Sequence, residues 1–289
     1  MQINKKQIEE INNIQLEIFK NFIDVCDKLN LKYYMVHGSL LGSVRYKGFF
    51  PFDDDIDVAM PREDYETFIK NGQKLLKANY FIQCNKTERD YPLVFAKIRD
   101  SNTTFIQPVL KNININKGIY IDIFPIDNYP TSISSLLKIK LLEKIYRTRV
   151  LAQLNKKRNI IKNIICKISK IILPNHEIAI KKLNNLYINV PKTNMCIVYG
   201  GKTLERKISL DLFGEGKKLK FEGLDIIVPN KYKEYLNIIY GDYTSYSPCK
   251  QYMVNKELIE ISANIIDTKN SYKLYENKNK KDKDKENEK

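Results

Sequence analysis

Four aspartates crowd into the five-residue segment DDDID at residues 53–57. Carboxylates this close repel one another, and each raises the pKa of its neighbours unless a cation lies between them. Side chains two positions apart on a strand share a face, so we predict that Asp55 and Asp57 project together. A divalent ion between them would relieve the repulsion, and Mg²⁺ or Mn²⁺ suits oxygen ligands of this kind. We expect Asp53 to ligate the ion or orient a ligand, and Asp54 to face away.

A glycine–serine pair, Gly38 and Ser39, lies upstream of the aspartates in the string HGSLLGSVR at residues 37–45. We predict that it ends a strand and opens a short helix, with Ser39 as the N-cap. The free backbone N–H groups and the positive dipole end of such a helix bind phosphate. A phosphate-binding turn beside metal-binding carboxylates is typical of phosphoryl-transfer sites.

A further carboxylate, Asp122, lies within the apolar string GIYIDIF at residues 118–124, a predicted strand. A lone carboxylate among apolar neighbours is costly to bury unless it has a partner. Asp122 is therefore a candidate for the same site. The alternative is an aspartate that bonds to the backbone at a strand end.

Length and composition exclude several classes of protein. The chain has 289 residues, 43% of them hydrophobic, which is enough for one large core or two modest ones. Its start is polar and it has no long apolar run, so neither a signal peptide nor a membrane span is expected. Two histidines exclude a histidine-rich metal site, and five widely spaced cysteines fit a reducing cytoplasm.

The positive charge is concentrated in one segment. The net charge is +15, and residues 131–174 hold eleven basic residues against the single acid Glu143, which gives 11 − 1 = +10. The basic residues there are Lys138, Lys140, Lys144, Arg147, Arg149, Lys156, Lys157, Arg158, Lys162, Lys167 and Lys170. Their spacing among Leu and Ile predicts a basic amphipathic helix that rests on an anionic membrane, or helices with solvated lysines. Nucleic acid is disfavoured because aromatic residues are not interleaved.

The order of apolar periods predicts an α/β (α+β) fold, a mixed sheet flanked by helices with a helical insertion and a small C-terminal module. Helices are expected at 4–30, 62–77, 132–187 with a break near Pro174, and 231–240. Strands are expected at 31–36, 55–60, 80–84, 93–98, 103–107, 118–124 and 224–229. We divide the chain into a catalytic core (1–130), a basic helical segment (131–190), a C-terminal part of the same domain (191–270) and a disordered charged tail (271–289).

The string GSLLGSVRYKGFFPFDDDIDVAMPREDYETF closely resembles the defining segment of the LicD family. The strings KIRD, IDIFPID, FEG, VPNKY and YGDY follow in the family's order. The resemblance is strong over about 31–130 and moderate over about 205–250. It implies a nucleotidyltransferase fold and a Mg-dependent transferase that moves a phospho-alcohol, best known as phosphocholine from CDP-choline, onto a cell-surface glycan such as lipopolysaccharide or a lipid-linked precursor. It also implies a cytoplasmic enzyme, peripheral on the inner membrane face if the basic segment binds lipid.

The resemblance also implies roles for individual residues. The catalytic and metal-binding carboxylates would be Asp55, Asp57 and Asp122, with Asp53 as an additional ligand. The donor- and phosphate-binding residues would be Gly38, Ser39, Arg45, Lys97 and Arg99.

Two other functions remain open from the residues. A nucleotidyltransferase that adds a nucleoside monophosphate to a small molecule or polymer needs the same carboxylates. A basic scaffold that binds a membrane or nucleic acid would need only the 131–174 segment. The transferred alcohol, whether choline, glycerol or ribitol, and the acceptor sugar are not specified by the sequence.

Overall fold

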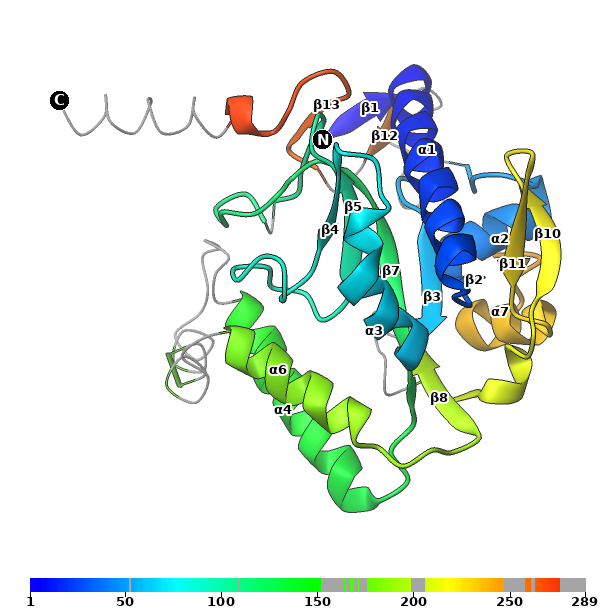
Figure 1. Cartoon of the computed structure of the whole chain (residues 1–289), viewed down its shortest axis with the longest axis vertical. Coiled ribbons are helices and arrows are strands. Elements are labelled where there is room, and N and C mark those ends of the chain that lie inside the picture. Colours follow the sequence, from blue (N-terminus) through cyan, green and yellow to red (C-terminus); the bar gives the residue numbers. More distant parts are fainter. Residues whose placement is uncertain are drawn as a thin grey trace, which may run out of the picture.

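The structure, a computed structural model, describes most of the chain (Figure 1). The described residues are 1–51, 53–108, 110–151, 164, 167–168, 171, 176–198, 206–246, 258–260 and 263–275. The helices are α1 (Lys5–Leu29), α2 (His37–Tyr46), α3 (Arg62–Asn71), α4 (Ile133–Leu151), α6 (His176–Ile188) and α7 (Tyr232–Tyr240), with 3-10 turns η1 (Gly72–Lys74) and η3 (Leu210–Leu212).

A seven-stranded mixed sheet forms the centre of the fold. The strands run in the order β2-β3-β7-β5-β4, and β8 pairs with both β7 and β9. They are β2 (Tyr34–Met35), β3 (Asp57–Pro61), β4 (Tyr80–Gln83), β5 (Ala96–Asp100), β7 (Ile119–Asn128), β8 (Met195–Val198) and β9 (Ile208–Ser209). β3 and β7 are parallel, whereas the other pairs are antiparallel. The expected α/β (α+β) class with a mixed sheet is confirmed.

Helix α1 forms where the apolar period predicts it. Asn4 and Gln7 make a reciprocal capping box, with both backbone-to-side-chain bonds at 3.0 Å. The helix ends at Asn30, which adopts the left-handed conformation with φ of 51°. Its buried face includes Ile18, Phe19 and Phe22, and burying each such side chain stabilises the fold by about 1.5–3 kcal/mol.

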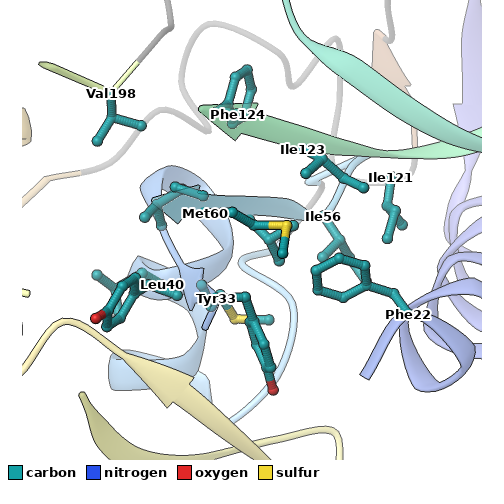
Figure 2. Packing of buried hydrophobic residues seen from close by; sticks show 14 of the residues in the cluster. Phe22, Tyr33, Leu40, Ile56, Met60, Ile121, Ile123, Phe124 and Val198 are labelled. Carbon is teal, nitrogen blue, oxygen red and sulfur yellow. The ribbon is translucent and has the colours of Figure 1, made fainter. Parts of the chain in front are cut away.

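Part of the main hydrophobic core packs on one face of β3 and β7. Ile121 and Ile123 alternate with Asp122 along β7, so they point to the opposite face from the carboxylate. They pack with Ile56, Met60 and Phe22, as Figure 2 shows. The prediction that Ile56 points into the core is confirmed, because its side chain is fully buried.

Helices α4 and α6 pair as a hairpin that covers one end of the sheet (Figure 1). A separate apolar cluster joins them, with Ile139, Tyr146, Ile180 and Leu183 in its centre. The expected helical segment is confirmed in its described parts, and the break predicted near Pro174 lies outside the described residues.

Among the described residues, three smaller strand pairs lie outside this sheet. They are β10 (Lys217–Phe221) with β11 (Leu224–Val228), β1 (Gln2–Asn4) with β12 (Leu258–Glu260), and β6 (Thr104–Ile106) with β13 (Ile265–Asp267). Tyr272 is buried and its backbone N–H donates to the Thr103 carbonyl at 3.1 Å. The tail boundary predicted at 271 therefore falls too early, and the tail beyond 275 lies outside the described residues.

Several predicted boundaries shift. Helix α3 ends at Asn71 rather than near 77, because the chain tightens into η1 where Gly72 passes close to Phe68 and Ile82. Strand β5 begins at Ala96 and reaches Asp100, three residues later than predicted at its start. In the described parts of the chain, no helix combines the length and the apolar character needed to cross a bilayer.

Candidate active site

A row of polar side chains crosses four neighbouring strands on the face opposite Ile121 and Ile123. Asp57 on β3 pairs in register with Asp122 on β7. Asp122 is opposite Lys97 on β5, and Lys97 is opposite Gln83 on β4. Residues opposite one another in a sheet project to the same face, so the row is continuous. Two motifs far apart in the sequence thus meet at one place.

The aspartates form two overlapping groups. One oxygen each from Asp55, Asp57 and Asp122 lie within 4.8 Å of one another. Oxygens of Asp53, Asp54 and Asp55 satisfy the same limit. Asp55 and Asp57 do lie together as predicted, although Asp55 belongs to the loop before β3 and not to the strand. The expectation that Asp54 faces away is wrong, because residues 53–56 precede β3 as a loop and do not alternate as a strand would.

Burial and mutual repulsion disfavour charge on these carboxyl groups. Burial, then the charge of Asp54, raises the pKa of Asp53 to about 7. Burial raises the pKa of Asp54 to about 6, and it raises those of Asp55 and Asp57 well above the ordinary range, with neighbouring aspartates adding to both. The aspartate group therefore has too few neighbouring positive charges to balance its carboxylates at neutral pH. Asp53 Oδ2 is also buried without a hydrogen-bond partner in the described part of the chain. An oxygen-rich site of this kind fits a hard divalent ion.

Lys97, on the strand next to Asp122, supplies one positive charge that compensates the negative charge of the carboxylates. Its side chain is 3% exposed, and its Nζ donates a hydrogen bond to Asp122 Oδ1 and forms an ion pair with it. The ammonium also lies 3.4 Å from the centroid of the Tyr120 ring. Burial lowers the pKa of Lys97, while Asp122 opposes that change. Lys97 is thus a buried counter-ion for Asp122.

Arg99 lies deeper than the sequence suggests. It is 0% exposed, Nε donates to Gln83 Oε1 at 2.5 Å, and Nη1 donates to the Gly118 carbonyl at 2.6 Å. Its guanidinium stacks over Tyr120, with 4.7 Å from Cζ to the ring centroid. Burial between strands favours a supporting role for Arg99 over the direct phosphate contact expected from its charge.

The Gly38–Ser39 pair lies at the start of α2, next to the carboxylates. A Cβ at Gly38 would come within 2.7 Å of Asp53 Oδ2, so only glycine fits this approach without displacement. The prediction that Ser39 caps the helix is wrong. Val36 is the N-cap, and Ser39 Oγ instead accepts from the Asp57 N–H at 2.9 Å. The hydroxyl therefore fixes α2 to the first residue of β3.

Arg45 extends from the other end of α2. It is exposed, its Nη1 donates to the Tyr246 carbonyl at 2.5 Å, and its guanidinium lies over the rings of Tyr46 and Phe50. Of the three basic residues expected at the donor, Arg45 alone is exposed.

Comparison with known proteins shows which domain contains these residues. Residues 30–143 match the LicD/FKTN/FKRP nucleotidyltransferase domain. The chain carries a LicD-family domain. The matched residues include α2, β3, β5 and β7, and so every carboxylate and both buried bases of the site.

Curated relatives extend the similarity beyond this LicD domain. The chain is 28% identical over 260 residues to the lipopolysaccharide cholinephosphotransferase LicD of Haemophilus influenzae, an alignment that covers 85% of this chain and 94% of the relative. It is 34% identical over 86 residues to an uncharacterised protein of Rickettsia typhi, which is 29% of this chain and 28% of that protein. An uncharacterised protein of Rickettsia prowazekii is 38% identical over 64 residues, which is 22% of this chain and 24% of that protein.

Two residues near the site, both outside the matched LicD domain, were not predicted from the sequence. Gln15 on α1 is fully buried, and its Nε2 donates to the Asp54 carbonyl at 2.7 Å and to the Tyr120 carbonyl at 3.2 Å. The position of this glutamine on the apolar face of α1 could have indicated a buried polar contact. Tyr240 on α7 lies near enough to Asp57 and Asp53 that their charges, after burial, raise its pKa. Tyr240 begins the YGDY string that resembles the family, but nothing in that string indicated a position near the carboxylates.

Proposed function

We propose that this protein is a Mg²⁺- or Mn²⁺-dependent phosphotransferase that moves phosphocholine from CDP-choline onto lipopolysaccharide or a related cell-surface glycan. The observation that carries the proposal is the convergence of Asp55, Asp57 and Asp122 within 4.8 Å. The similarity to the Haemophilus influenzae cholinephosphotransferase over most of both chains supports the transferred group and the class of acceptor.

The reaction is a substitution at phosphorus. An acceptor hydroxyl oxygen forms a bond to the phosphorus that bears choline, and the bond from that phosphorus to the bridging oxygen breaks. CMP leaves with the electron pair of the broken bond. The hydroxyl proton passes to a carboxylate of the aspartate group that does not ligate the ion. A bound divalent ion would neutralise charge on the diphosphate oxygens.

The aspartates divide the work according to their positions. Asp55 and Asp57 are the proposed primary metal ligands, since they belong to the group that also contains Asp122. Lys97 holds Asp122 in one orientation through their hydrogen bond. We therefore propose that Asp122 ligates the ion and does not accept the proton. Asp53 lies against Gly38 at the start of α2, so it is proposed to orient ligands where the donor diphosphate meets the helix N-terminus.

Aromatic residues near the carboxylates suit a choline group. Quaternary ammonium ions bind to the faces of aromatic rings. The rings of Tyr240 and Tyr246 lie 4.5 Å apart between centroids, inclined at 45°. We assign Tyr240 to the alcohol end of the donor because its ring lies against that of Tyr246, whose carbonyl accepts from the exposed Arg45. The charges of Asp57 and Asp53, which help to raise the pKa of Tyr240, agree with this position.

A panel of nucleotides tests the proposal without knowledge of the acceptor. Thermal stabilisation of the purified protein would be measured with CDP-choline, CDP-glycerol, CDP-ribitol, CTP and ATP, each with Mg²⁺ and with EDTA. We expect Mg²⁺-dependent stabilisation by CDP-choline above the others, lost in Asp57→Asn and retained in Asp225→Asn. Asp225 is a matched control because it is an exposed aspartate on β11, paired with Lys220 at 2.9 Å. Stabilisation by CTP or ATP with none by CDP-alcohols would instead support nucleotide addition and contradict the proposal.

A further inference from the structure

Exposed apolar side chains gather on the α4–α6 hairpin and the segment between its helices. Twelve large hydrophobic residues are exposed in the described part of the chain, and eight of them lie between residues 133 and 188. The eight are Ile133, Leu137, Leu141, Ile164, Ile168, Ile171, Ile178 and Ile188. Soluble proteins rarely expose a cluster of apolar residues in one region of the surface unless that region is a binding site.

Helix α4 has two distinct faces. Its inner face, with Ile139 and Tyr146, is buried against α6. On its outer face Ile133 is 76% exposed, and Leu137 and Leu141 are each 61% exposed. Spacing of four residues places these three side chains in one stripe along the helix. The stripe therefore points away from the apolar cluster that holds the hairpin together.

Lysines lie within the same stripe. At about 100° per residue, Lys140 and Lys144 project within about 60° of Leu137, on the outer face. Both are exposed, and neither Lys140 nor Lys144 has a carboxylate partner among the described residues. We call the set Ile133, Leu137, Lys140, Leu141 and Lys144 the outer face of α4.

The pattern recurs further along the chain. Ile164, Ile168 and Ile171 are each helical and exposed. Lys167 beside them is exposed as well. Residues 131–174 carry +10 overall, as eleven basic residues and one acid. The acid, Glu143, is buried and accepts from Tyr187 at 2.5 Å, so it does not offset charge on the outer face.

We propose that the outer face of α4 docks this protein onto an anionic lipid bilayer. Leucine and isoleucine side chains would enter the boundary between headgroups and acyl chains, while Lys140 and Lys144 reach the anionic headgroups. Charge complementarity selects this occupant. A second copy of the chain would bring one strongly basic surface against another, and the like charges would repel.

The docking surface is separate from the carboxylate site, because none of its residues belongs to the polar row on the sheet. Binding to lipid is therefore expected to survive loss of the metal ligands. A protein held at a bilayer would meet acceptors that are themselves attached to lipid, which gives the surface a purpose under the proposed function without depending on it.

Flotation with vesicles tests the proposal on the full-length protein. We expect the protein to float with vesicles of phosphatidylcholine mixed with phosphatidylglycerol, and at least about tenfold less with vesicles of phosphatidylcholine alone. Leu137→Ser/Leu141→Ser is expected to reduce flotation by a similar factor at unchanged thermal stability, since both side chains are already exposed. High salt is expected to release the protein, because screening weakens the attraction between lysines and headgroups.

A charge-matched comparison isolates the outer face. Lys140→Glu/Lys144→Glu should abolish flotation, whereas Lys74→Glu/Lys218→Glu, which changes the net charge equally at exposed positions on η1 and β10, should retain it. Equal loss in both double variants would mean that net charge alone attracts the protein, and it would overturn the assignment to α4. Flotation indifferent to lipid charge would overturn it too, as would a dimer in size-exclusion chromatography that Leu137→Ser/Leu141→Ser disperses without any effect on vesicles.

Discussion

Asp57 and Asp122 lie directly opposite each other on the parallel strands β3 and β7. Each projects from the face that is opposite Ile121 and Ile123, and Asp55 joins them from the loop that precedes β3. The site is therefore built on two paired strands whose geometry is fixed by backbone hydrogen bonds. Its carboxylates are held close together even though burial and repulsion raise their pKa values.

Divalent metal is expected to stabilise the protein through Asp57. Mg²⁺ added to metal-free protein should raise Tm, because the ion relieves the repulsion among these crowded, partly buried carboxylates. Asp57→Asn should lose this effect and should be at least as stable as the wild type in EDTA, because it removes one of the repelling groups. Differential scanning fluorimetry measures both. A Mg²⁺ response that is unchanged in Asp57→Asn would show that the ion binds elsewhere.

Lys97 and Asp122 are expected to depend on each other for stability. Lys97→Met leaves a buried carboxylate without its counter-ion, so we expect a loss of about 3–5 kcal/mol in the free energy of unfolding. Lys97→Met/Asp122→Asn should recover part of that loss, because both charges are gone. Urea unfolding of the wild type, the two single variants and the double variant in EDTA gives the coupling energy. Strict additivity of the two single changes would contradict the pairing.

Asp127 is expected to be structural although it lies only five residues beyond Asp122. Its two oxygens accept from Arg62 Nε at 2.7 Å and Nη2 at 2.5 Å, and its side chain is 3% exposed. Asp127→Asn should lower the free energy of unfolding by about 3–5 kcal/mol, since Arg62 would lose its buried partner. Affinity for CDP-choline, measured by calorimetry below the Tm of the variant, should stay the same. A stable variant that fails to bind donor would place Asp127 in the site.

Tyr240 is expected to select choline over uncharged alcohols. Tyr240→Leu keeps an apolar side chain of similar bulk but removes the ring that would face a quaternary ammonium. We expect CDP-choline to bind about tenfold more weakly and CDP-glycerol to bind nearly as before. Tyr243→Leu is a suitable control, since Tyr243 also packs against the main core. Equal weakening of both donors by Tyr240→Leu would assign the tyrosine to packing or to the shared cytidine diphosphate.

Much of the site follows from local patterns in the sequence. The alternation of Asp55, Ile56 and Asp57 predicted which side chains enter the core, and the apolar string around Asp122 marked a buried carboxylate. The helical period of α1 predicted its bounds to within one residue at each end. These features depend on residues that are close in the sequence, so they can be predicted from the local sequence alone.

The remaining features depend on contacts between distant segments. Lys97 and Arg99 were expected at the donor because of their charge, but the register of β5 against β7 buries them beside Asp122 and Tyr120. Ser39 was expected to cap α2, but β3 lies close enough for its hydroxyl to accept from Asp57 instead. Strand register and helix placement are set by the whole core, and short motifs do not encode them.

An assay of phosphocholine transfer tests most directly whether these carboxylates form the active site. The purified protein would be incubated with Mg²⁺, CDP-choline labelled in the choline methyl groups, and lipopolysaccharide as acceptor, with Asp57→Asn and Asp225→Asn run in parallel. We predict label in the lipopolysaccharide and CMP released in equal amounts by the wild type and by Asp225→Asn, and neither by Asp57→Asn. Transfer of cytidine to the acceptor, or transfer of label that persists in Asp57→Asn, would contradict a phosphocholine transferase built on these carboxylates.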